Sequence, residues 1–278
     1  MTDWLVDTHC HLQDDLAVAD TLVERMEANR TRVVLMGTQP PTPDDAGDWD
    51  RVSSLCKSAR AVVAAPGYGV HPWYAHKHVQ NQASWLGDLE RRLLEDPRAI
   101  VGEIGLDRVA RVPGTNTNAY EAAQVPVFEA QMALAGRLAR PVSMHCVKAY
   151  GQLLDRLKMR DKPWAPRVSI HSCTGSPDIV KALQQQQQQQ DRNVVDLYFG
   201  FSSCVCQRRR HGDDDQKLWQ TIATVRDDRL LLESDRASIE PVAAELHAMA
   251  ALFAEVKGWS ASETVDITTR NANRFLCG

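Results

Sequence analysis

Eight short apolar runs recur along the chain and alternate with longer stretches of helical character, and this pattern restricts the possible folds more than any other feature. Continuous apolar runs, as opposed to strict alternation, indicate strands that are buried on both faces, as in parallel sheets. In chain order the runs are WLVDTH (4–9), RVVLMGT (32–38), AVVAAPGYGVH (61–71), AIVGEIGLD (99–107), RPVSMHC (140–146), RVSIHSC (167–173), LYFGFSS (197–203) and RLLLESD (229–235).

Helices are expected between the runs, for instance over residues 14–29, 120–139 and 240–257. The first of these helices would carry Leu16, Val23 and Met26 on its apolar face. Eight strand–helix units within 278 residues predict an α/β protein, a (β/α)8 TIM barrel. A doubly wound parallel sheet is the alternative. No linker divides the chain, so we expect a single domain over residues 1–278.

Composition excludes some classes of protein. A net charge of −4 and a pI of about 6.1 argue against a broad basic surface that coats nucleic acid, although a bound metal would add local positive charge. The seven cysteines lack the paired spacing of a zinc finger and indicate free thiols in a reducing compartment. No signal segment or membrane-length apolar run is present, so we expect an intracellular protein without a membrane partner.

Residues able to bind metal lie at the ends of six of the predicted strands. His9 and His11 are two residues apart on the first strand, so both imidazoles lie on the same side of it. The other strand ends contribute His71, Glu103 with Asp107, His145, His171 and Asp235. In a (β/α)8 barrel the carboxyl ends of all strands share the face on which active sites are built.

These side chains together predict a metal centre, because buried histidines and carboxylates are costly unless they are paired or bind a cation. Nitrogen and oxygen ligands suit Zn²⁺, Mn²⁺ or Mg²⁺. Six ligands exceed the needs of one tetrahedral zinc, so two divalent ions about 3.5–4 Å apart are expected. Glu103 is the candidate bridge, because a carboxylate offers two oxygens.

Seven motifs in this order resemble the TatD family of metal-dependent deoxyribonucleases, which are amidohydrolase-like barrels. They are DTHCHL, GVHPW, VGEIGLD, PVSMHC, HSCTGS, LLLESD and the closing TTRNANRFL. The resemblance covers the chain from about residue 4 to residue 276. The stretch GEIGLDRVARVP and the glutamine tract Gln184–Gln190 are most similar to the fungal members, some of which are described as Cut-nine-interacting proteins.

The resemblance implies roles for individual residues. His9, His11 and Asp235 would bind the first metal, Glu103 would bridge, and His145 and His171 would bind the second metal. Asp235 would also take a proton from the attacking water, and His71 would face the scissile phosphate. The implied reaction is hydrolysis of DNA from its 3′ end, with single-stranded DNA as the expected partner and cleavage at abasic sites as a related possibility.

Some positions depart from the family pattern. Lys148 stands near the place of an arginine that would grip phosphate, and a lysine cannot form the same two-pronged contact. Arg236 replaces a small residue after Asp235, and it would contact a phosphate or form a surface salt bridge. Trp73 would stack on a base or stand as an ordinary rim aromatic.

Further expectations concern the surroundings of the site. Asp7 and Asp107 would orient ligands, or Asp107 would cap its loop. Cys10, Cys146 and Cys173 would point away from the metals and pack. Segments 108–120 and 204–215 would be irregular and border the barrel mouth. RRRH (208–211) would be a solvated loop or would steer DNA, and the glutamine tract would be a helix end or a surface loop.

Two other functions remain open at this point. One is a small-molecule amidohydrolase or lactonase on the same barrel, although the bridge position holds Glu103 and not a lysine. The other is a catalytically weak binding protein whose barrel serves as a scaffold. Both would use the same ligands, and only an assay with candidate substrates separates them.

Overall fold

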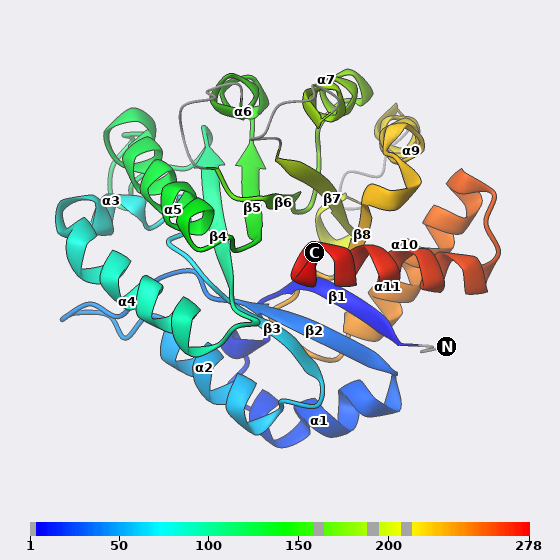
Figure 1. Ribbon diagram of the computed structural model, residues 1–278, viewed down its shortest axis with the longest axis horizontal. Helices are drawn as coiled ribbons and strands as arrows, with labels where there is room; N and C mark the ends of the chain where they lie inside the picture. Colours follow the sequence, from blue (N-terminus) through cyan, green and yellow to red (C-terminus); the bar gives the residue numbers. More distant parts are fainter. Residues whose placement is uncertain (1–3, 158–163, 188–194, 207–212) are drawn as a thin grey trace.

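Eight parallel strands form one sheet that curls into a barrel in the order β1 to β8, in a computed structural model that describes residues 4–157, 164–187, 195–206 and 213–278 (Figure 1). The strands are β1 (Leu5–Cys10), β2 (Thr31–Met36), β3 (Val63–Tyr68), β4 (Ile100–Asp107), β5 (Val142–Val147), β6 (Arg167–Ile170), β7 (Asp196–Ser202) and β8 (Leu230–Glu233). The predicted (β/α)8 barrel is therefore confirmed, and the doubly wound sheet is excluded by this strand order.

Helices pack around the strands, and most of them lie on the outside of the barrel (Figure 1). They are α1 (Val18–Ala28), α2 (Trp49–Ser58), α3 (Ala75–His78), α4 (Gln82–Glu95), α5 (Val125–Arg137), α6 (Tyr150–Leu157), α7 (Pro177–Gln187), α8 (Ser203–Cys206), α9 (Asp213–Thr224), α10 (Val242–Lys257) and α11 (Ala261–Cys277). None of the described helices is long and apolar enough to cross a membrane.

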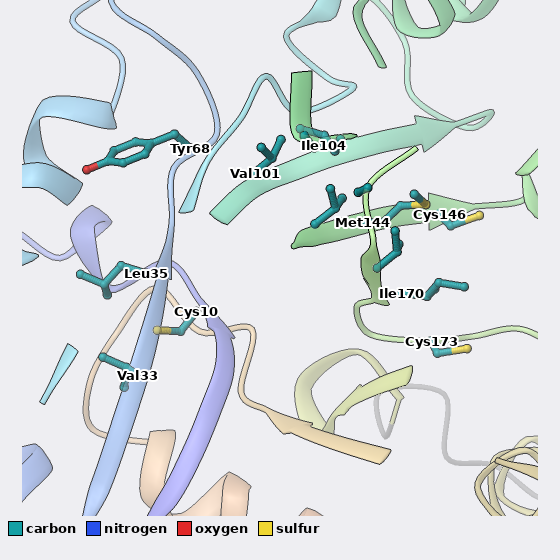
Figure 2. Close-up of a cluster of buried hydrophobic side chains, with 14 of the residues drawn as sticks. Cys10, Val33, Leu35, Tyr68, Val101, Ile104, Met144, Cys146, Ile170 and Cys173 are labelled. Carbon is teal, nitrogen blue, oxygen red and sulfur yellow. The ribbon is translucent and has the colours of Figure 1, made fainter. Parts of the chain in front are cut away.

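The strands bury both of their faces, as continuous apolar runs require. On β2, Val33 and Leu35 belong to the large cluster that packs against the helices, whereas Val34 and Met36 belong to a second cluster inside the barrel. Figure 2 shows part of the first cluster, in which cysteines lie among aliphatic side chains. The predicted packing of Cys10, Cys146 and Cys173 is confirmed, and all seven cysteines are free.

The inner cluster forms the floor of the barrel, at the amino ends of the strands. Its strand residues include Val6 and Ile100, and α11 adds Ala272 and Phe275. The ring of Phe275 is fully buried and lies 5.5 Å from the ring of Tyr198. Figure 1 shows α11 lying beside β1, so the closing motif of the sequence serves to plug the barrel.

Hydrogen bonds between β1 and the end of β8 close the barrel. The amide of Asp235 donates to the carbonyl of His9 (2.9 Å), and the amide of His11 donates to the carbonyl of Arg236 (2.8 Å). The buried carboxylate of Asp7 accepts from the amide and the hydroxyl of Ser234 and from the amide of His9. The sequence predicts that Asp7 orients a ligand. In the structure Asp7 does so through the backbone of His9 and Ser234, and not by contact with a ligand imidazole.

Two local expectations change. Leu16 lies before α1 and is 84% exposed, because the helix starts only at Val18 and buries Val18, Leu22 and Met26. The segment 108–119 is irregular as expected, but the short helix α8 and the first turn of α9 lie within 204–215.

Two low-complexity stretches lie partly or wholly outside the described residues. Helix α7 extends into the glutamine tract as far as Gln187, which supports the helix-end interpretation for that part. The side chain of Gln184 is buried and bonds the carbonyl of Thr224 and the amide of Arg226. Residues 188–190 of the tract and the stretch 208–211 fall outside the described part of the chain.

Candidate metal centre

The six predicted ligands converge at the carboxyl end of the barrel interior. Together with the imidazole of His71, their nitrogen and oxygen atoms form overlapping groups, and within each group the candidate atoms lie within 4.8 Å of one another. The groups are His9–His11–Asp235, His9–Glu103–His171 and His71–Glu103–His145. Strands β1, β4 and β5, and the loops after β3, β6 and β8, therefore deliver their side chains to one place.

Glu103 stands at the centre of the cluster, and each of its oxygens faces a different pair of histidines. Oε2 lies 3.3 Å from Nε2 of His9 and 3.2 Å from Nε2 of His11. Oε1 lies 2.9 Å from Nδ1 of His145 and 2.8 Å from Nε2 of His171. The carboxylate thus separates the cluster into two sets of donor atoms.

Asp235 completes the set on the Oε2 side. Its Oδ1 lies 3.5 Å from Nε2 of His11 and 3.8 Å from Nε2 of His9. Its other oxygen, Oδ2, accepts a hydrogen bond from the hydroxyl of Ser172 (3.2 Å), and that hydroxyl also bonds Ser202 (2.6 Å). The two carboxylate oxygens of Asp235 therefore have different neighbours, one toward the histidines and one toward a buried serine pair.

Hydrogen bonds behind the imidazoles determine which nitrogen faces the cluster. Nδ1 of His11 donates to the carbonyl of Met36 (2.9 Å), and Nδ1 of His9 bonds the hydroxyl of Ser143 (2.8 Å). His145 is turned the other way, because its Nε2 faces Oδ2 of Asp107 at 3.3 Å. The carbonyl of Met36 and the carboxylate of Asp107 can only accept, so in the neutral rings of His11 and His145 the opposite nitrogen keeps a lone pair for a metal.

His71 is held differently. Its Nδ1 accepts a hydrogen bond from the backbone amide of Trp73 (3.2 Å), so the proton of the neutral ring is on Nε2. That Nε2 lies 3.2 Å from Oε1 of Glu103. A ring in this state donates a hydrogen bond, which suits contact with an anionic substrate better than metal binding.

The electrostatics of the site favour cations around Glu103, whereas individual histidines differ in their protonation. Burial lowers the pKa of His9 and of His71 to about 4, so both rings are neutral. Burial alone would raise the pKa of Glu103, but the surrounding histidines, His71 and His171 foremost, hold it well below its ordinary value. The bridge is therefore a carboxylate anion with the neutral rings of His9 and His71 beside it. Burial works against protonation of His145, but its hydrogen bonds to Asp107 and Glu103 raise its pKa to about 9, so a metal that binds there displaces a proton.

The donor set fits divalent metal ions. Nε2 of His9 and Nε2 of His11 lie 3.2 Å apart, and Nδ1 of His145 lies 3.2 Å from Nε2 of His171. Pairs of imidazole nitrogens this close leave lone pairs facing each other unless a proton or a cation lies between them. Nitrogen and carboxylate ligands without a thiolate match the ions expected from the sequence.

Several residues of the site escape detection by sequence reasoning. Ser143 lies two residues before His145 on β5, and Ser172 follows His171, but a serine at such places has no distinctive signal. Glu233 lies in LLLESD, fully buried, with its Oε1 3.9 Å from Nδ1 of His171. It accepts a bond from the amide of Ser172, and burial raises the pKa of its carboxyl to about 8. The sequence signal for Glu233 is its position two residues before Asp235, which in a continuous strand places both side chains on the same side.

The predicted substrate residues lie around the mouth. Trp73 is 54% exposed, and its indole nitrogen donates to Oδ2 of Asp107 (2.8 Å). Lys148 is exposed just after β5. The guanidinium of Arg236 pairs with Glu245, which is the salt bridge considered from the sequence. Asp107 combines both expected roles, since it also accepts from the amides of Val109 and Ala110.

A parallel eight-stranded barrel that gathers histidines and carboxylates at its carboxyl end defines the class of metal-dependent hydrolases built on TIM barrels. Within this class, the chain matches the family model described as TatD related DNase over residues 6–277. The chain belongs to the TatD-related DNase family, as its motifs predict. The expectation of an enzyme acting on DNA is confirmed at the level of this family.

Known proteins similar to this chain agree with that assignment. The Cut9-interacting protein scn1 of Schizosaccharomyces pombe is 25% identical, and the alignment covers 98% of each chain. The 3′-5′ ssDNA/RNA exonuclease TatD of Edwardsiella piscicida is 32% identical over 68% of this chain and 67% of its own. The structure of YJJV, a TatD homolog from Escherichia coli, superimposes with a TM-score of 0.76 at 22% identity and 99% coverage of both chains. This last similarity supports the fold.

Proposed function

We propose that this protein is a metal-dependent exonuclease that hydrolyses phosphodiester bonds of DNA from the 3′ end at a dinuclear centre. The observation that carries the proposal is the position of Glu103, whose two oxygens face two different histidine pairs. A carboxylate in this position would hold two divalent ions at the separation of about 3.5–4 Å that is typical of two-metal phosphodiester chemistry.

The ligands divide naturally between the two ions. His9, His11 and Asp235 would hold one ion with Oε2 of Glu103. His145 and His171 would hold the other with Oε1. When bound, Mg²⁺, Mn²⁺ or Zn²⁺ ions would supply positive charge to the phosphate and activate a water molecule.

The side chains of the chain itself would handle protons and orientation. Hydrogen bonding and the charges of nearby histidines, His11 foremost, outweigh burial and lower the pKa of Asp235, so it is ionised and able to accept a proton from water. Its side chain is 15% exposed, which lets water reach it from the mouth. Nε2–H of His71 would donate to a phosphate oxygen, since its proton position is fixed by the amide of Trp73.

The substrate would lie across the mouth of the barrel. Lys148 would attract the phosphates of the strand, Arg236 would do so only on release from its salt bridge with Glu245, and Trp73 would contact the nucleotide nearest the metals. Single-stranded DNA is the proposed substrate class, and the printed name of the Edwardsiella piscicida relative refers to single-stranded DNA and RNA. Abasic DNA is a related substrate for the same chemistry. The seven free cysteines support an intracellular location.

The test is digestion of a 5′-labelled single-stranded oligonucleotide by the purified full chain with Mg²⁺ or Mn²⁺. A ladder that shortens from the 3′ end, and that disappears on chelation, is expected. A double-stranded DNA, an RNA of the same sequence and a panel of lactones and cyclic amides serve as comparison substrates. Hydrolysis of the small molecules without cleavage of any oligonucleotide would contradict the proposal in favour of an amidohydrolase, and bound metal without any turnover would favour a binding protein.

A further inference from the structure

An open groove of about 480 Å³ lies beside the metal centre between the loop after β3 and the loop after β4. Volumes of this order are typical of sites for small molecules. Trp73 belongs to the first wall of the groove, while Val109, Arg111 and Pro113 belong to the second. Trp73 is 54% exposed and Val109 is 48% exposed, so two large apolar side chains face solvent next to a charged site.

The indole of Trp73 is fixed in a way that leaves its face available. Its one polar atom, Nε1, already donates to Asp107 at 2.8 Å. Its ring stands perpendicular to the ring of His71, with 5.0 Å between the centroids. The indole therefore has no free hydrogen-bonding group and offers a ligand mainly a flat aromatic surface.

The side chain of Asp107 connects the wall of the groove to the metal centre. Oδ2 of Asp107 accepts from Trp73 and also lies 3.3 Å from Nε2 of His145, a proposed metal ligand. Oδ1 of the same carboxylate accepts from the amides of Val109 and Ala110, which fixes the second wall. A ligand in the groove is thus held at a defined place relative to the ions.

A positive charge borders the groove. The guanidinium of Arg111 is folded against its own loop, where Nη1 bonds the carbonyls of Val109 (2.9 Å) and Ala110 (3.1 Å). No carboxylate pairs with Arg111 within the described part of the chain. The groove therefore combines an aromatic face, an opposing aliphatic wall and a cation, a combination suited to a nucleotide.

We propose that this groove binds the base of a nucleotide next to the scissile phosphodiester, by stacking of the base on Trp73. The inference rests on the proposed nuclease function, since it identifies a subsite of the same centre. Base–aromatic stacking tolerates every base, so the groove would position the strand without selecting its sequence. The protein would then prefer strands that carry a base at one defined position from the cleaved bond.

The first experiment compares oligonucleotides that carry one tetrahydrofuran abasic analogue at the first, second or third nucleotide from the 3′ end. Wild-type protein should show a kcat/KM about tenfold lower for the analogue at one of these positions than for the intact strand. Trp73→Ala should lose this discrimination, and Trp73→Phe, which keeps a stacking face but not the N–H donor, should retain most of it. Trp219→Ala serves as the matched control, because Trp219 is a 43% exposed tryptophan on α9 outside the groove.

The second experiment does not depend on catalysis. In saturation-transfer NMR with chelated full-length protein, the base protons of thymidine 5′-monophosphate should receive more saturation from wild type than from Trp73→Ala. Deoxyribose 5-phosphate, which lacks the base, should receive equally little from both. Equal saturation of the base by both proteins, or abasic discrimination that persists in Trp73→Ala, would overturn the inference. Failure to cleave any oligonucleotide would instead overturn the nuclease proposal, and the NMR result would still decide whether the groove binds a base.

Discussion

The two ends of the barrel interior are lined by the same strands but by opposite kinds of side chain. At the amino end, Val34, Ile100 and Leu231 pack on Phe275 of α11, and all four are fully buried. At the carboxyl end, the same sheet presents His9, Glu103 and the other ligands. Burial of each apolar side chain at the floor stabilises the fold by roughly 1.5–3 kcal/mol, whereas buried ionisable groups are unfavourable unless they are paired.

The layer between the two ends shows how the barrel interior changes from apolar to polar side chains. Gly200 on β7 pairs with Leu231 on β8, and a Cβ at Gly200 would overlap the side-chain carboxyl group of Glu233. The absence of a side chain on β7 therefore makes room for a buried carboxyl beneath His171. We conclude that the floor provides stability for the fold while the mouth is organised for chemistry, and the two can be separated by mutation.

Glu103→Gln should have the largest effect, and only at the mouth. The amide keeps the shape of the side chain but removes the charge and one of the oxygen ligands. Nuclease activity should fall by at least about a thousandfold, because electrostatic stabilisation at such centres is the main source of rate. Metal content by mass spectrometry and labelled-strand kinetics measure the effect.

Circular dichroism should show an intact fold for Glu103→Gln. Glu95→Gln, a change at the end of α4 far from the cluster, is the control. A Glu103→Gln protein as active as wild type would refute the assignment of the site.

Phe275→Ala tests the floor of the barrel, and it should lower stability while leaving activity nearly unchanged. Loss of this buried ring should lower the free energy of unfolding by about 3–5 kcal/mol through the cavity it leaves. Activity per folded molecule at low temperature should stay near the wild-type value, since the ring lies at the other end of the barrel. Urea denaturation combined with kcat gives both quantities, and a variant of normal stability would show that α11 is not needed as a plug.

The free energy of unfolding of the metal-free protein should decrease with rising pH, because of two ionisable groups at the mouth of the barrel. Burial works against protonation of His145, but its hydrogen bonds to Asp107 and Glu103 prevail and raise its pKa to about 9. The pKa of Glu233 is raised to about 8, chiefly by burial. Because the unfolded chain releases these protons at lower pH, the free energy of unfolding should decline between about pH 6.5 and 9, on the order of 2 kcal/mol.

Metal binding should remove much of that pH dependence, because a bound histidine has no proton to lose at its ligand nitrogen. Urea denaturation at pH 6.5, 7.5 and 9, with chelator and with Mn²⁺, measures the difference. A stability of the chelated protein that rises with pH over this range would contradict the prediction.

Ser172→Ala should produce the smallest effect. It removes the hydroxyl that holds Oδ2 of Asp235, so Oδ1 would be less well directed toward the first metal. A decrease in kcat of about tenfold is expected, with little change in KM, because partners of ligands typically contribute this much. Ser58→Ala on α2 is the control, and an unchanged kcat for Ser172→Ala would show that Asp235 is oriented by other contacts.

Much of the fold was accessible from the sequence, because strand and helix patterns are local. The eight runs mark the eight strands, and the polar residues that end them are the residues that converge. The start of α1 was misplaced, since Leu16 continues the apolar pattern of the helix although the chain turns into it only at Val18. Ser143 was missed because its partner His9 is 134 positions away and no local pattern connects them.

The sequence by itself determined the barrel, the identity of the six clustered residues and the family. Periodicity and residue type are properties of short stretches, so they can be recognised without knowledge of the rest of the chain. Only the tertiary structure decided which nitrogen of each histidine faces inward, which oxygen of Glu103 meets which pair, and that Trp73 is joined to His145 through Asp107. Those features depend on how the curled sheet brings distant strands within hydrogen-bonding distance, and that closeness exists only once β1 has met β8.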